Sequence, residues 1–115
     1  MNESVIDRAV YAKLRDTTGA EFAAELADTF IEEGPTMLAE LRAARAEGNA
    51  ERFRRAAHSL KSNGMTFGAV KLTTLAREFE LKGLDADPAG DLAGLAALEA
   101  EYVHAAAELK DLRNG

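Results

Sequence analysis

The sequence predicts an all-α protein, an up-down antiparallel bundle of four long helices with one or two additional short helices. Apolar residues recur every three or four positions along most of the chain, and the glycines and prolines fall between these stretches. No segment alternates with period two over several β-branched residues, so no strands are expected. The chain has 115 residues, of which 47% are hydrophobic, enough to fill one core. We therefore expect a single domain over residues 1–115, with short connections between antiparallel neighbours.

The first helix is expected to be short, with one apolar stripe from Ile6 to Leu14. The four residues that follow its end, Thr-Gly-Ala-Glu, fit a capping box. In that motif the Thr18 hydroxyl and the Glu21 carboxylate each satisfy a free backbone donor. A second helix is therefore expected to begin near Thr18.

The second and third helices are expected on either side of Gly34-Pro35, since Gly suits a left-handed cap and Pro cannot continue the hydrogen-bond ladder. The apolar face of the second helix consists of Phe22, Leu26 and Phe30. The third helix carries Leu38, Leu41 and Ala44. Gly48 should end the third helix, and Asn49 can cap the next one.

Three further helices complete the expected bundle. The fourth spans about residues 50–67 and ends at a break, Gly68-Ala69. The fifth ends at Gly83, and after a loop over residues 84–87 the last begins at Asp87-Pro88, an N-cap followed by Pro at the first helical position. The apolar residues of the fifth helix are Leu72, Leu75, Ala76 and Phe79; those of the last are Leu95, Leu98, Tyr102, Ala105, Leu109 and Leu112.

Composition excludes several classes of function. Lys and Arg number 14 against 20 Asp and Glu, a net charge of -6, which argues against a nucleic-acid binder because phosphate contacts need a basic face. The absence of cysteine removes thiolate nucleophiles and Cys-ligated zinc. No apolar run approaches the length of a membrane span, and no signal peptide is visible, so we expect a cytoplasmic protein. No phosphate-binding loop of Walker type is present.

The fourth helix carries a polar face that looks like a functional site. Each helical residue advances about 100° around the axis. Measured from Phe53, a core stripe falls within roughly 60°, and it consists of Phe53, Ala56, Ala57, Leu60, Gly64 and Phe67. His58 falls about 140° away, so its ring is expected to point at water.

The neighbours of His58 on this face are two cations, a small residue and a thioether. Arg54 lies one turn before it, Lys61 and Ser62 lie about one turn after it, and Met65 lies two turns after it. Two flanking cations should favour the neutral, nucleophilic ring and would hold an anion attached to it. A neutral imidazole can attack phosphorus without a separate base, so the face suits a group that accepts a phosphoryl from a docked protein.

The segment 57–69, Ala-His-Ser-Leu-Lys-Ser-Asn-Gly-Met-Thr-Phe-Gly-Ala, resembles the signature of histidine-containing phosphotransfer (HPt) domains of two-component phosphorelays. The resemblance covers most of the chain and is strongest over residues 53–80, where Phe79-Glu80 resembles the helix after the motif. It implies that His58 is the phosphoacceptor, on the ring nitrogen farther from the backbone. It also implies that Lys61 stabilises the phosphoryl charge and that Ser62, where many members have Gly, leaves room for the partner. Gly68 would permit close packing where the motif helix meets the next helix.

The same resemblance implies the partners. Receiver domains of hybrid histidine kinases and response regulators would donate and accept the phosphoryl group through an aspartate. The receiver would supply Mg²⁺, so no metal or cofactor is expected in this chain. The protein would then be a monomeric phosphocarrier without an ATP site, and not an enzyme that turns over a substrate alone.

A cluster of arginines across the third and fourth helices has two interpretations. It consists of Arg42, Arg45, Arg52, Arg54 and Arg55. These residues either form a solvated face with ion pairs to Glu40, Glu47 and Glu51, or steer the chain toward an acidic receiver pocket. Arg54, Arg55 and Met65 are the expected docking residues.

Two alternative functions stay open at this point. The first is a docking adaptor that uses the same face without phosphorylation, a degenerate HPt domain. The second is a metal-dependent four-helix-bundle enzyme, because Glu101 and His104 form a Glu-x-x-His pattern. Di-iron bundles need two such motifs and further Glu residues, so a solvated surface histidine is the favoured interpretation of His104.

Overall fold

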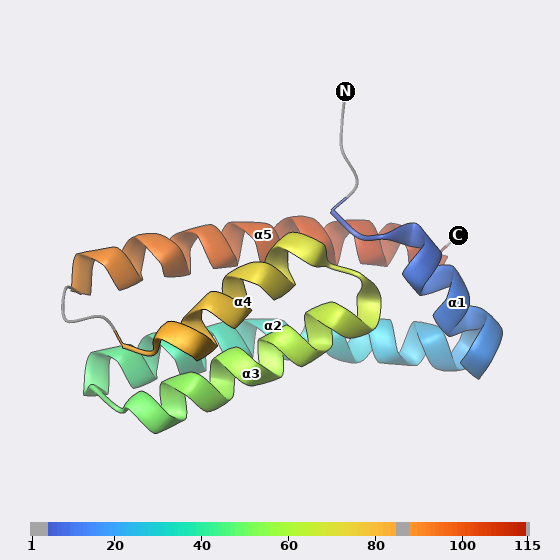
Figure 1. Cartoon of the computed structure of the whole chain (residues 1–115). Coiled ribbons are helices and arrows are strands. Elements are labelled where there is room, and N and C mark those ends of the chain that lie inside the picture. Colours follow the sequence, from blue (N-terminus) through green and yellow to red (C-terminus); the bar gives the residue numbers. More distant parts are fainter. Residues whose placement is uncertain (1–4, 85–87, 115) are drawn as a thin grey trace.

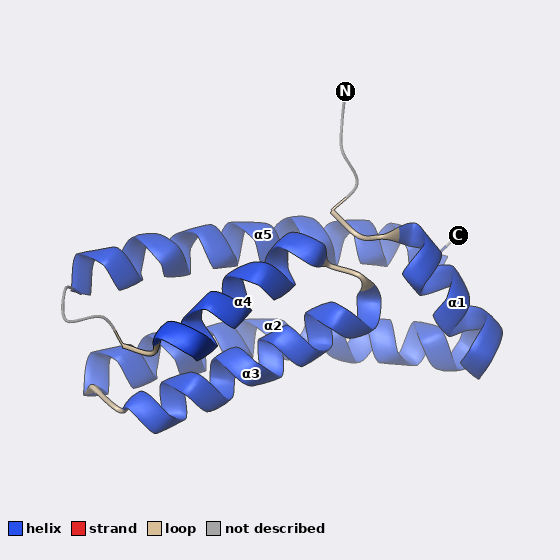
Figure 2. Ribbon diagram, in the orientation of Figure 1, coloured by secondary structure: helices blue, strands red, loops and turns tan. Residues whose placement is uncertain are grey.

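The computed structural model describes residues 5–84 and 88–114, and within them it contains five helices and no strand. The helices are α1 (Arg8–Thr18), α2 (Ala20–Glu47), α3 (Ala50–Phe67), α4 (Val70–Lys82) and α5 (Pro88–Asn114). The last four run alternately up and down, and α1 packs against α2 and α3 at the end of the bundle where α2 begins (Figure 1). The predicted all-α bundle of four helices with one short additional helix is confirmed (Figure 2).

The helices form a ring in which each long helix packs on two others. Close contacts join α2 to α3, α3 to α4, α4 to α5 and α5 back to α2. Aromatic rings link these contacts: Phe30 lies 5.2 Å from both Phe67 and Tyr102, and Phe53 meets Phe79 edge-on at 5.4 Å, centroid to centroid. Such geometry adds to the burial of apolar area. No helix in the described part of the chain is both long and apolar enough to cross a membrane.

The predicted break at Gly34-Pro35 is wrong, because α2 runs through it without interruption. Pro35 has no N–H, so the Ile31 carbonyl loses its helical donor. The buried Tyr102 hydroxyl from α5 lies 2.9 Å from that carbonyl oxygen and 2.9 Å from the carbonyl oxygen of Phe30. A Cβ on Gly34 would lie only 2.0 Å from the Tyr102 ring, so the ring reaches α2 because position 34 has no side chain. A contact between helices thus replaces the missing backbone bond.

Three smaller expectations need correction or fall outside the described residues. The capping box at residues 18–21 does not form. Helix α1 continues through Thr18, and the Thr18 hydroxyl donates to the Leu14 carbonyl at 2.7 Å. Helix α2 begins after Gly19 and has no side-chain cap. Phe22 is 49% exposed and lies outside the core, because α2 turns its alanines inward at this end. The proposed cap at Asp87 lies outside the described residues, although α5 does begin at Pro88.

Burial of the Tyr102 hydroxyl among apolar neighbours raises its pKa to about 12, so the group stays a neutral donor. We predict that Tyr102→Phe lowers the free energy of unfolding by about 1–2 kcal/mol, because the Ile31 carbonyl then has no donor. In a Pro35→Ala background, where residue 35 regains its N–H, the loss should shrink by about 1 kcal/mol. Urea unfolding of the four proteins measures this coupling, and an equal loss in both backgrounds would contradict the account.

Candidate functional site

Helix α3 presents His58 to solvent, as its periodicity predicts. The buried residues of this helix are Phe53, Ala56, Ala57, Leu60, Gly64 and Phe67, which are the six predicted for the core stripe. The His58 side chain is 58% exposed. Asn49 caps the start of the helix, where its side chain accepts a hydrogen bond from the Arg52 N–H, and the helix has the predicted bounds. The bounds of the helix and the direction of the ring are therefore confirmed.

A glycine lets α4 approach α3 beside this site. A Cβ on Gly64 would lie 2.5 Å from the Thr73 hydroxyl oxygen, closer than real side chains come. The absence of a side chain at Gly64 therefore leaves room for the Thr73 side chain of α4 at this contact. This close approach places Glu80, two turns further along α4, within reach of the polar face of α3.

Glu80 joins the two central residues of the site. One carboxylate oxygen forms a hydrogen bond with Nδ1 of His58, and the other lies 2.6 Å from the Lys61 ammonium nitrogen. The Glu80 side chain is only 17% exposed. The Lys61 ammonium, and after it the His58 ring, hold the pKa of the Glu80 carboxyl below its ordinary value. Glu80 is therefore an anion throughout the neutral range.

The contact with Glu80 corrects one expectation about His58. The expected environment of the ring was two cations, Arg54 and Lys61, that keep it neutral by repulsion. The nearest charged partner of the ring is instead a carboxylate, and that carboxylate also engages Lys61. Helical arithmetic on α3 could not find Glu80, because the residue comes from another helix. Its only signal in the sequence is the match of Phe79-Glu80 to the family's following helix.

The expected docking residues surround His58 on the same face. Arg54 and Arg55 are exposed and line one surface pocket of about 440 Å³ with His58, Ser59 and Glu80. Ser62 is exposed one turn from the ring. Met65 is 61% exposed. Arg54 and Arg55 therefore lie in one pocket with the ring, while Ser62 and Met65 are exposed further along the same helix. Their roles in docking are taken up below.

Gly68 has a different neighbour from the one expected. It ends α3 in the left-handed conformation, at φ 72°, which favours glycine. A Cβ there would lie 2.9 Å from the Val10 Cβ and 3.0 Å from Asp7, both at the start of α1. The carbonyl of Gly68 also accepts a hydrogen bond from the Asp7 N–H at 2.7 Å. Gly68 thus permits close packing against the start of α1, and the close contact between α3 and α4 lies instead at Gly64.

Most of the arginines in this cluster form ion pairs. Arg52 pairs with both Glu40 and Glu47. Two arginines of α2 reach α5: Arg42 donates to Glu99 at 2.7 Å, and Arg45 lies 3.2 Å from the buried Asp91. Among the described residues, Glu51 has no ion pair, and neither do Arg54 and Arg55. The expected ion pairs to Glu40 and Glu47 therefore form for Arg52, whereas Arg42 and Arg45 have other partners on α5. The buried pair of Arg45 with Asp91 is not part of a solvated face.

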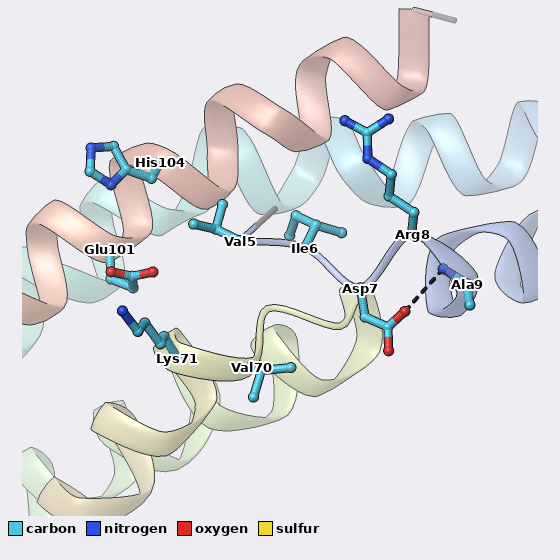
Figure 3. A pocket seen from close by; sticks show the side chains of 9 residues that line it. All are labelled: Val5, Ile6, Asp7, Arg8, Ala9, Val70, Lys71, Glu101 and His104. Carbon is cyan, nitrogen blue, oxygen red and sulfur yellow. Dashed lines mark hydrogen bonds between the residues drawn. The ribbon is translucent and has the colours of Figure 1, made fainter. Parts of the chain in front are cut away.

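The Glu101 and His104 pair lies elsewhere on the molecule. Figure 3 shows both residues on α5, lining a pocket with Lys71 of α4 and the segment before α1. One Glu101 carboxylate oxygen is buried with no hydrogen-bond donor. Within residues 5–84 and 88–114, no three metal-ligating side chains gather in one place. The structure thus offers no ligand set for the metal-enzyme alternative in this part of the chain.

Comparison with known proteins gives a family and a fold. No curated protein matches the chain. A solved structure, histidine-containing phosphotransfer protein B (HptB) from Pseudomonas aeruginosa PAO1, matches with a TM-score of 0.82 and 27% sequence identity, over 98% of this chain and 97% of that one. The Hpt domain family model matches residues 25–114, which include α3, α4 and the whole polar face around His58. The chain therefore belongs to the Hpt domain family.

Proposed function

We propose that this protein is a phosphorelay intermediate, which accepts a phosphoryl group on His58 from the aspartate of one receiver domain and passes it to another. Membership of the Hpt family supports a phosphotransfer role in two-component signalling, since proteins of this family carry phosphoryl groups. The similarity to HptB, itself a histidine-containing phosphotransfer protein, points the same way. One observation carries the proposal for His58: its ring is exposed, and Nδ1 is the ring nitrogen that bonds the Glu80 carboxylate.

The hydrogen bond to Glu80 determines which ring nitrogen can react. A carboxylate only accepts hydrogen bonds, so the neutral His58 ring carries its proton on Nδ1. Nε2 then keeps its lone pair, and it is the nitrogen farther from the backbone. The ring therefore offers a nucleophile to a docked partner without a separate base.

The transfer step balances without the loss of a proton. The Nε2 lone pair of His58 attacks the phosphorus of a receiver aspartyl phosphate, the bond from phosphorus to the aspartate oxygen breaks, and the aspartate leaves as a carboxylate with that electron pair. The ring becomes positively charged while Nδ1 keeps its proton. Glu80, an anion bonded to that proton, stabilises the charged ring. The reverse step delivers the phosphoryl group to the next aspartate.

The other residues of the face balance the charge of the phosphoryl group and allow the receiver to approach. Lys61 neutralises Glu80, so a phosphoryl dianion on the ring does not lie beside an unbalanced carboxylate. Ser62 leaves space one turn from the ring. Arg54 and Arg55 steer an acidic receiver pocket to the face, and Met65 gives it an adaptable apolar contact.

The remaining parts of the proposal concern the partners and the whole chain. The receiver domains belong to hybrid histidine kinases and response regulators, and they bring the Mg²⁺ that the transfer needs. This chain contributes no cofactor, no metal and no ATP site. It acts as a cytoplasmic monomer, with residues 1–115 as one domain.

We expect His58→Gln to accept no phosphoryl group, because the nucleophile is gone while the exposed surface is retained. The measurement mixes the variant and the unsubstituted protein with a panel of phosphorylated receivers and follows acid-labile label. Receiver binding should persist in the variant. Equal labelling of both proteins would refute His58 as acceptor, and unchanged signalling with no label on either protein would favour the docking adaptor.

We expect Glu80→Gln to slow transfer about tenfold, since a hydrogen bond to a charged group contributes about 1.5–3 kcal/mol and this one lies near the surface. The side-chain amide of this variant can donate as well as accept, so it no longer requires the proton on Nδ1. It is also uncharged, so it no longer stabilises the positive ring. Glu78→Gln is the matched control, because it removes the same charge from an exposed position of α4. Single-turnover transfer from a phosphorylated receiver measures the effect, and equal rates for the two variants would remove Glu80 from the mechanism.

We expect Ser62→Gln to lower the transfer rate at least about tenfold without unfolding the domain, because a longer side chain fills the approach space beside the ring. Ser62→Ala, which keeps the residue small, should transfer at the normal rate. Circular dichroism checks that both variants are folded. A normal rate for Ser62→Gln would show that the receiver does not approach across this residue.

A further inference from the structure

We propose that residues 5–18, the N-terminal arm, open as one unit on a hinge at Gly19 while α2 to α5 stay folded, and that Glu108 is the latch that holds the arm closed. The arm consists of the segment 5–7 and α1, and it lies at the end of the bundle where α2 begins (Figure 1). The Hpt family model begins at residue 25, so the arm lies outside the matched region. Its opening is a conformational change that the proposed phosphotransfer at His58 does not require.

The arm buries few side chains against the bundle. Among the eleven residues of α1, all of which the structure describes, only Tyr11 is buried, whereas α3 buries six of its eighteen. In the described segment before α1, Ile6 is buried. A helix as short as α1 is marginal in water on its own, so its order depends on these attachments. Regions with so few buried apolar contacts open locally at a lower free energy than global unfolding.

Polar contacts hold the arm closed at two points. One carboxylate oxygen of Glu108, on α5, accepts hydrogen bonds from the backbone N–H groups of residues 5 and 6, at 2.7 and 3.1 Å. The other oxygen accepts from the Arg8 guanidinium at 3.2 Å, and the Glu108 side chain is only 13% exposed. The second point is the Asp7 N–H, which donates to the Gly68 carbonyl at 2.7 Å. A charged acceptor shared by three donors is the stronger attachment, so Glu108 is the latch.

A single glycine joins the arm to α2. Gly19 has φ 93° and ψ 150°, a conformation that glycine adopts without strain and other residues do not. A Cβ at this position would meet nothing within 4 Å, so the junction is not packed against the rest of the protein. A hinge requires a residue whose backbone angles change against little steric resistance. Gly19 meets this requirement, and it lies where the arm ends.

Opening of the arm changes one end of the bundle and leaves the polar face in place. It uncovers the sites where Ile6 and Tyr11 are buried, and it frees the Gly68 carbonyl at the end of α3. The contacts of Glu80 with His58 and its neighbour on α3 involve no residue of the arm. The open state therefore keeps the phosphoacceptor site while it exposes apolar surface at the far end of the same helix.

Hydrogen exchange of the full chain under native conditions, followed residue by residue by NMR, tests this device. In the unsubstituted protein the α1 amides should share one protection factor, at least about tenfold below that of the core amides of α2 to α5. A helix that only frays would instead show protection that falls gradually along α1. Exchange needs neither a receiver nor a phosphoryl group, so its result is independent of the proposed function.

Two variants separate opening of the arm from unfolding of the bundle. Tyr102→Phe weakens the bundle away from the arm, so it should lower the protection of the core amides about 5- to 30-fold and leave that of α1 unchanged. Glu108→Ala should lower the protection of α1 about tenfold or more. The Asp7 amide reports this loss best, because its acceptor at Gly68 is retained. Asp111→Ala removes an exposed carboxylate from the same helix and should change neither value.

A third variant tests the hinge. An alanine at position 19 is strained in the closed arm, and the strain is relieved on opening only if this residue changes its backbone angles. Gly19→Ala should therefore lower the protection of α1 roughly fivefold or more. Gly48→Ala puts a side chain at another positive φ, 68°, between α2 and α3, and should leave the protection of α1 unchanged.

The contrary results are distinct for each part of the device. An equal fall of α1 and core protection in Tyr102→Phe would show that the arm opens only when the whole chain unfolds. Unchanged α1 protection in Glu108→Ala would refute the latch. Unchanged α1 protection in Gly19→Ala would refute the hinge.

Discussion

The carboxylate of Glu80 bonds two side chains of the neighbouring helix at once, the His58 ring and the Lys61 ammonium. The chemistry of the site depends on this shared contact. In the proposed transfer it fixes the proton on Nδ1, leaves the Nε2 lone pair for the phosphoryl group, and sets a negative charge against the ring as the ring becomes positive. The contact exists because α4 lies close to α3, and that distance depends on the missing side chain at Gly64.

The scaffold under this site depends on a second contact between helices. Tyr102 takes the place of the N–H that Pro35 lacks, and the bare backbone of Gly34 admits its ring. The helix α2 therefore stays continuous from Ala20 to Glu47, and it packs against both α3 and α5 along its length. An interrupted α2 would leave α3 without one wall of the core stripe that turns His58 outward.

The periodicity of a single helix predicts what lies within that helix. The six buried residues of α3, its bounds at residues 50 and 67, and the exposure of His58 all follow from the spacing of apolar residues and from Asn49 and Gly68 as caps. Contacts between helices have no such periodicity. Neither the partner of His58 nor the continuity of α2 through Pro35 could be predicted, since Glu80 and Tyr102 come from other helices. The neighbour of Gly68 on α1 was missed for the same reason.

The direct test of the account is the NMR spectrum of the His58 ring in protein labelled with nitrogen-15, recorded before and after phosphorylation by a receiver domain. The account predicts a proton on Nδ1 in both states, a bare Nε2 at first, and coupling of Nε2 to phosphorus afterwards. A proton on Nε2 of the free protein, or phosphorus coupled to Nδ1, would contradict it.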